Sequence, residues 1–76
     1  MRGNSTTEAR RRRIAIAEQI VKKLGRDEYI KAVSMISFNL GVTEAKAREY
    51  LKILSNTGVI EIKNGYVNYI GSSKAA

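Results

Sequence analysis

Apolar residues recur at intervals of three and four along the first third of the chain, which is the spacing of a helix that buries one face. The stripe consists of Ile14, Ala17, Val21 and Leu24, joined by Ile16 and Ile20. Upstream, residues 5–8 have the form of a capping box, in which the Ser5 hydroxyl and the Glu8 carboxylate each accept a bond from a free backbone N–H. Gly25 suits the left-handed residue that ends a helix. We therefore predict a first helix from about Thr6 to Leu24.

Two shorter apolar stripes follow, and each predicts a further helix. The first consists of Tyr29, Val33, Ile36 and Leu40. It stops at Gly41 and is preceded by a short connection at Arg26-Asp27, although Tyr29-Ile30 also fits a short strand. The second consists of Ala47, Tyr50, Leu51 and Leu54. Thr43 is a good N-cap for this third helix, which we expect to end around Asn56.

Near the C-terminus the pattern changes from helical spacing to that of strands. Residues 59–63 and 66–70 are rich in β-branched and aromatic residues, and only Asn64-Gly65 separates them, which is the strongest short signal for a β-hairpin. Such a turn fixes the register. The expected pairs are Lys63 with Tyr66, Ile62 with Val67, Glu61 with Asn68 and Ile60 with Tyr69. We expect the face that packs against the helices to consist of Ile60, Ile62, Val67 and Tyr69.

These elements fit a single domain. At 76 residues the chain suffices for one hydrophobic core, and 43% of its residues are hydrophobic, as in a globular protein. Because cysteine is absent, stability has to come from apolar packing. We predict a folded domain over residues 6–70, with flexible ends at residues 1–5 and 71–76.

Charge indicates the class of partner. The chain has 14 lysines and arginines against 7 acidic residues, a net charge of +7, and residues 1–13 alone contain five arginines and one glutamate. A basic run is often only a solvated helix face, but its field attracts polyanions, of which nucleic acid is the commonest in a cell. No apolar run approaches the ~20 residues of a membrane span, and no secretory signal is present. We expect a cytoplasmic, nucleoid-associated protein without a membrane partner.

Residues 33–52 predict two short helices joined by a tight turn. Apolar residues stand where the helices meet, namely Ile36, Leu40, Val42, Ala47 and Tyr50. This segment and the hairpin resemble, over residues 27–70, the winged helix-turn-helix DNA-binding regulators of bacteria and archaea. The resemblance implies an α+β fold, a three-helix winged helix-turn-helix domain with a C-terminal two-stranded β-hairpin wing. Ser37 replaces the family's usual alanine, and its hydroxyl is tolerable if it bonds back to a carbonyl one turn earlier.

In that family the helix after the turn lies in the major groove and the wing contacts the backbone. The resemblance assigns these roles to helix 43–56 and wing 63–66. On the helix, the candidate DNA-binding residues are Thr43, Glu44, Ala45, Lys46, Arg48, Glu49 and Lys52. In the wing and the N-terminal run they are Lys63, Asn64, Arg10, Arg11, Arg12 and Arg13.

The chemistry of these side chains divides them by role. Only the Arg48 guanidinium presents a fork that binds guanine through two hydrogen bonds. Phosphate contacts are better suited to Thr43, Lys46 and Lys52. The carboxylates of Glu44 and Glu49 are repelled by phosphate, although a carboxylate accepts from cytosine; Glu44 is explained equally well as favourable charge at a helix N-terminus.

Two apolar residues of the second helix, Met35 and Phe38, lie roughly opposite its predicted core stripe. In so short a chain they suggest that another subunit or the N-terminal helix covers them. Regulators of this kind are commonly two-fold dimers that read two half-sites. We therefore expect a homodimer whose interface includes Ile16, Ile20, Met35 and Phe38.

Catalysis needs titratable or nucleophilic groups that converge on a pocket, yet the chain has no histidine, no cysteine and Asp27 alone among aspartates. We expect no enzyme activity, no metal and no cofactor, and no small-molecule ligand is evident from the sequence. We expect double-stranded DNA as the partner of a transcriptional regulator. One rival is a winged-helix protein-interaction module of replication, transcription or membrane-remodelling machinery, which the two glutamates and the exposed apolar residues favour. Another is a basic chromatin protein that coats DNA regardless of sequence.

Overall fold

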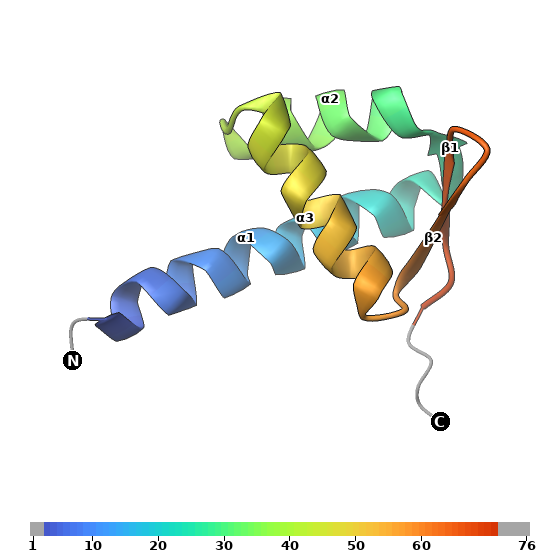
Figure 1. Cartoon of the computed structure of the whole chain (residues 1–76). Helices are drawn as coiled ribbons and strands as arrows, with labels where there is room; N and C mark the ends of the chain where they lie inside the picture. The colour runs from blue at the N-terminus through green and yellow to red at the C-terminus, as the bar shows by residue number, and fades with distance from the viewer. Residues whose placement is uncertain (1–2, 72–76) are drawn as a thin grey trace.

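The computed structural model describes residues 3–71, and the side chains of residues 8–71 within them. The elements are α1 (Gly3–Leu24), β1 (Arg26–Glu28), α2 (Tyr29–Leu40), α3 (Glu44–Asn56), β2 (Ile60–Lys63) and β3 (Tyr66–Tyr69), as drawn in Figure 1. Three helices followed by a terminal hairpin form the α+β arrangement of a winged helix, which confirms the predicted fold class.

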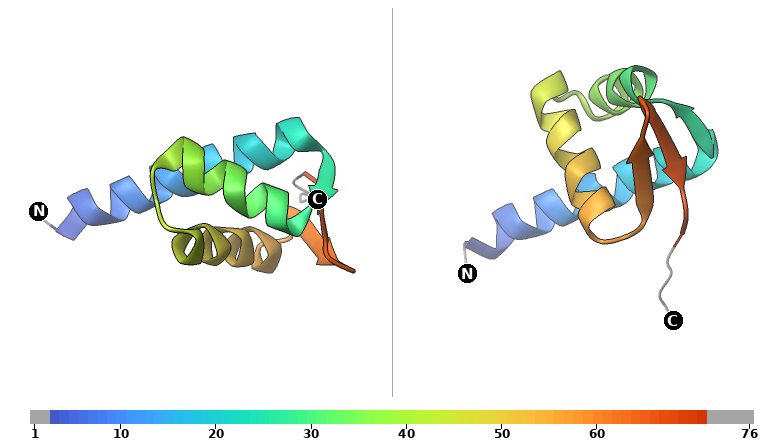
Figure 2. Two further views of the ribbon diagram at one scale, coloured as in Figure 1. Left: turned by 90° about the horizontal axis from the view of Figure 1, so that it is seen from above. Right: turned by 45° about the vertical axis from the view of Figure 1, so that its right-hand side comes forward.

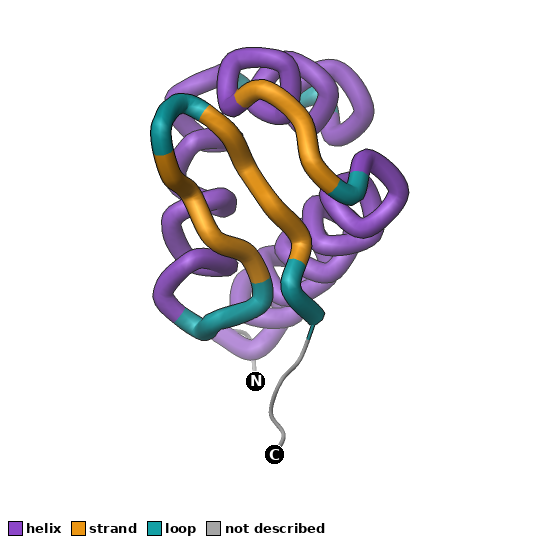
Figure 3. The backbone as a smooth tube through the Cα atoms, turned by 90° about the vertical axis from the view of Figure 1, so that its right-hand side faces the viewer, coloured by secondary structure: helices purple, strands orange, loops and turns teal. Residues whose placement is uncertain are grey.

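The three helices form a layer that the small sheet closes at one end. In Figure 1 α1 runs across the molecule, α2 lies above it and α3 crosses in front. Viewed from above, α2 is nearest the viewer, with α1 on one side of it and α3 on the other (Figure 2, left), and α1 and α3 also contact each other. The N-terminal part of α1 extends beyond the other elements. Figure 3 shows the sheet face-on, with the helices behind it. One face of the sheet therefore packs on the helices and the other faces solvent.

A single core holds these elements together. Its buried side chains are Ala17, Val21, Ala32, Val33, Ile36, Ala47, Tyr50, Leu51, Leu54, Ile60 and Val67. They come from all three helices and from β2 and β3, and no polar or charged residue among those with described side chains is buried. Apolar burial is therefore the main stabilising term, as expected for a chain without disulfides.

The predicted start of α3 is confirmed, and the predicted start of α1 is wrong. Helix α3 begins as expected, because the Thr43 hydroxyl oxygen accepts a hydrogen bond from the Lys46 backbone N–H at 3.1 Å. Helix α1 begins at Gly3, so Ser5 lies inside the helix and the predicted capping box does not start it. Serine and threonine are tolerated in helix interiors, and nothing between Gly3 and Ser5 breaks the helix. Of the two predicted flexible ends, residues 1–2 and 72–76 lie outside the described residues.

The connection predicted at Arg26-Asp27 is instead strand β1. It pairs antiparallel with β3, so the sheet has three strands in the order β1-β3-β2. The predicted two-stranded hairpin is present as β2-β3, and β1 is a third strand that the sequence did not predict. The left-handed Gly25 (φ 70°) turns the chain, and its carbonyl accepts from the Tyr69 backbone N–H at 2.7 Å. The backbone groups of β3 are thereby paired on both sides.

The hairpin has the predicted register, from Ile60 opposite Tyr69 to Lys63 opposite Tyr66. Asn64 (φ 51°) and Gly65 (φ 78°) both have positive φ, the condition for a type I′ turn. The predicted buried face is wrong at one position, since Ile62 is 37% exposed. Ile62 follows Ile60 on the inward face but lies nearer the turn, past the end of the core.

The turn between α2 and α3 is closed by hydrogen bonds to Ser37. Its hydroxyl donates to the Val42 carbonyl oxygen at 2.6 Å, and its own carbonyl accepts from the Val42 N–H at 3.1 Å. The hydroxyl therefore bonds forward across the turn and not, as predicted, back along α2. Left-handed Gly41 (φ 66°) allows this close return.

Candidate nucleic-acid interface

Helix α3 presents its predicted outward face to solvent. Since Ala47, Tyr50, Leu51 and Leu54 are buried, the opposite side carries the candidate side chains. The exposed ones are Thr43, Glu44, Ala45, Lys46, Arg48 and Lys52, and Glu49 is half-buried. Helical periodicity alone was enough to place this set.

Glu49 lies between two cations. Its carboxylate accepts from the Arg10 guanidinium of α1 at 3.3 Å and from the Lys46 ammonium at 3.3 Å. These pairs are partly exposed and therefore weak, so an approaching phosphate can exchange partners with them. The negative charge at the centre of the α3 face is nonetheless compensated, which lessens the repulsion expected from the sequence.

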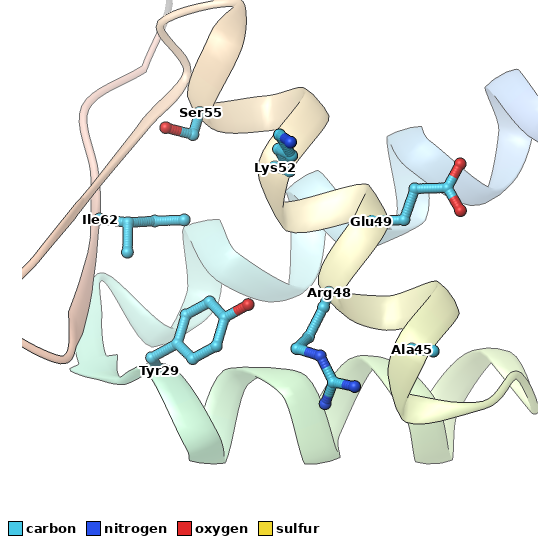
Figure 4. A pocket seen from close by; sticks show the side chains of 7 residues that line it. All are labelled: Tyr29, Ala45, Arg48, Glu49, Lys52, Ser55 and Ile62. Atoms are coloured by element: carbon cyan, nitrogen blue, oxygen red, sulfur yellow. The ribbon is translucent and has the colours of Figure 1, made fainter.

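The other two cations of this face have no protein partner. Within residues 8–71, neither the Arg48 nor the Lys52 side chain makes an ion pair or a hydrogen bond. In Figure 4 Arg48 extends toward α2, whereas Glu49 points in a different direction, toward α1. Both cations are therefore available to an anionic ligand.

A groove runs between α3, the start of α2 and β2. It has a volume of about 450 Å³ and is lined by Tyr29, Ala45, Arg48, Glu49, Lys52, Ser55 and Ile62 (Figure 4). The Tyr29 ring and the Ile62 side chain provide apolar surface, and Arg48 and Lys52 border it. The sequence did not predict this groove, because Ile62 was expected to be buried.

The wing adds a second cationic region. Lys63 and Asn64 are exposed at the hairpin tip, and the Arg26 guanidinium lies 5.0 Å from the centre of the Tyr66 ring. Such an exposed cation–π contact stabilises by about 0.5–1 kcal/mol. The sequence did not indicate a role for Arg26. Only the pairing of β1 with β3 brings Arg26 to the outer face of the sheet, beside Asn68.

The arginine run of α1 does not act as one unit. Arg10 reaches α3 through Glu49, whereas Arg11, Arg12 and Arg13 are exposed and make no ion pair with any described side chain. The run therefore places one guanidinium beside α3 and leaves three in solvent.

The candidate dimer residues differ in exposure. Phe38 is 86% exposed, so α1 does not cover it, and Ile16 and Met35 are 40% and 36% exposed. Ile20 packs partly against the core. Ile30, at 75% exposure, is a further apolar residue on α2 that the sequence reasoning did not single out.

Residues 3–71 contain no group of three or more histidine, cysteine or acidic side chains that could hold a metal ion. None of the helices in that range is both long and apolar enough to cross a membrane. Comparison of the chain with protein-family models, with curated proteins and with solved structures finds no match. The functional conclusion therefore depends on the residues and their geometry.

Proposed function

We propose that this protein binds double-stranded DNA as a transcriptional regulator, with α3 in the major groove and the hairpin wing on the flanking backbone. The observation that supports this most directly is which charged side chains of the α3 face are paired and which are free. Arg48 and Lys52 have no protein partner among the described residues, and the carboxylate of Glu49 is held by Arg10 and Lys46. A helix face with two unpaired cations, on which the carboxylate of Glu49 is compensated, suits a polyanion.

Within this proposal each side chain has a distinct role. Arg48 donates two hydrogen bonds to guanine, and the unpaired carboxylate of Glu44 accepts from cytosine. Phosphates are contacted by Lys46, Lys52 and the Thr43 hydroxyl. The Thr43 hydroxyl is only an acceptor in the cap bond, so its proton remains available to a phosphate. Lys63 and Asn64 contact the backbone from the wing. Arg10 neutralises phosphate on the side of α3 that faces α1, and the exposed Arg11, Arg12 and Arg13 neutralise phosphates that approach α1 itself.

In this function the protein binds DNA in the cytoplasm, is associated with the nucleoid, and catalyses no reaction. The test is a duplex titration at two salt concentrations, with a site selected from a random library and with random-sequence competitor. Affinity should fall steeply with salt, because condensed counterions are released from each neutralised phosphate, and the selected site should win over competitor. Salt-insensitive or undetectable binding contradicts the proposal. Equal binding to both duplexes indicates a sequence-independent chromatin protein instead.

A protein-interaction module is the second candidate, favoured by one observation. Phe38 and Ile30 expose large apolar side chains on α2, at 86% and 75%. An apolar side chain this exposed is removed from water when a partner protein covers it. This candidate predicts that duplex DNA is not bound at all, so the same titration separates the two functions.

We also propose that the regulator is a homodimer joined through α1 and the Phe38 side of α2, in an interface that includes Ile16, Ile20 and Met35. Phe38→Glu should then shift the protein toward monomer, because burying an unpaired carboxylate in the interface is costly. Sedimentation equilibrium at micromolar concentrations measures this. Ile30→Glu is the matched control, since Ile30 lies on the side of α2 next to Glu44 and Arg48. A monomeric parent protein, or a Phe38→Glu variant that stays dimeric, contradicts the proposal.

Lys63→Ala tests the wing. Because Lys63 is proposed to neutralise one phosphate, its loss should weaken binding to all sequences alike and lower the slope of log affinity against log salt by about one unit. The comparison is Lys31→Ala, which removes the same charge from α2, where Lys31 pairs with Asp27 at 3.5 Å. An unchanged slope for Lys63→Ala would place the wing outside the interface.

Glu49→Gln tests the compensated carboxylate. The amide retains the shape of the side chain but releases Arg10 and Lys46 from their ion pairs. Affinity for every duplex should therefore rise by about two- to fivefold, which corresponds to the energy of an exposed ion pair. The salt dependence should steepen as well. If binding instead falls for one sequence alone, Glu49 contacts a base directly. The far-UV circular dichroism melting curve serves as the folding control.

A further inference from the structure

We propose that the groove between α3 and β2 binds a small organic anion with an aromatic or branched apolar body, and that this ligand excludes DNA. The ligand site depends only on the groove. The exclusion of DNA rests on the proposed function, because it requires the duplex to use the same side chains.

The apolar body is accommodated by the floor of the groove. Ile62 belongs to the inward face of the hairpin, yet 37% of it is exposed because it lies beyond the core. It faces the groove together with the Tyr29 ring (Figure 4). Ala45 and Ser55 are small and leave the space open. With a volume of about 450 Å³ the groove falls in the range of small-molecule sites, roughly 300–1,000 Å³.

The sign of the ligand charge follows from the rim. Arg48 and Lys52 flank the floor without protein partners among residues 8–71, and the hydroxyls of Tyr29 and Ser55 donate to no described residue. The one carboxylate in the lining, that of Glu49, points away toward Arg10 of α1 (Figure 4). Two cations and two hydroxyl donors thus surround apolar surface, which matches a carboxylate or sulfonate on an apolar body.

Competition with DNA follows from shared side chains. If Arg48 and Lys52 hold the anion, they are not available to guanine and phosphate, so the two ligands cannot both make their contacts. By thermodynamic linkage, the factor by which the anion weakens DNA binding equals the factor by which DNA weakens anion binding. The groove is then an effector site located on the DNA-binding face.

The test uses two fluorescent probes that differ in charge. The anionic probe is 8-anilinonaphthalene-1-sulfonate, and the uncharged one is N-phenyl-1-naphthylamine, which has the same rings without the sulfonate. The parent protein should bind the anionic probe more tightly. Lys52→Ala should weaken the anionic probe several-fold and leave the neutral probe unchanged. Ile62→Ser should weaken both probes. Ile70→Ser, which removes an exposed apolar side chain outside the groove, should change neither.

Several results overturn the ligand site: no binding of the anionic probe, no preference for it over the neutral probe, or loss of binding in Ile70→Ser alone. Melting curves of each variant show whether it is folded, and Lys52→Ala, at an exposed position, keeps the test valid if Ile62→Ser unfolds. A duplex should then displace the anionic probe. Probe binding that a bound duplex leaves unchanged overturns the exclusion of DNA. Probe binding in a protein that binds no duplex supports the site while the proposed function fails.

Discussion

Leu51→Ala should lower the free energy of unfolding by about 2–5 kcal/mol, a loss comparable with much of the roughly 5–15 kcal/mol that stabilises a small domain. Leu51 is completely buried in the middle of α3, among core residues from all three helices. Truncation removes apolar contacts and leaves a cavity, because neighbouring side chains relax only partly. Urea unfolding followed by circular dichroism measures the change.

Ile30→Ala is the matched control for this substitution. It also shortens a large apolar side chain on a helix, but Ile30 is 75% exposed, so its loss should change stability by less than about 0.5 kcal/mol. If Leu51→Ala is no more destabilising than Ile30→Ala, α3 is not anchored in the core as described. The outward face of α3 would then lack a rigid support.

Much of the fold could be predicted because its signals are local. Thr43 as N-cap and Asn64-Gly65 as turn each depend on residues within a few positions, and both appear in the structure as expected. Strand β1 escaped prediction because three residues show no alternation, and their pairing with β3 joins segments about 40 residues apart in sequence. The predicted start of α1 at Ser5 was wrong because the sequence of a capping box is also compatible with a helix interior.

The candidate site could be predicted in part for the same reason. The period of α3 places Arg48 and Lys52 outward once the buried stripe is recognised. The contact between Arg10 and Glu49 spans 39 residues and depends on how α1 crosses α3. The groove depends on where the core ends beneath Ile62. Neither this contact nor the groove can be predicted from the sequence pattern of any single helix or strand.

Arg48→Ala should weaken binding to the preferred duplex by about 1–3 kcal/mol and relax the preference at one base pair. The guanidinium is free of protein partners, so its removal leaves no unpaired group in the protein and costs only the contact with DNA. Competition titrations with the selected site, with variants at each base pair and with random duplex separate affinity from discrimination.

Arg48→Lys distinguishes charge from geometry. Lysine retains the positive charge but loses the rigid fork, so if Arg48 reads guanine the lysine variant should recover part of the affinity for random duplex and little of the preference. If both variants lose affinity equally on selected and random duplexes, Arg48 contacts phosphate alone. Base recognition by α3 would then have to come from Glu44 or Lys46, at the start of the helix, where the cap at Thr43 fixes the backbone.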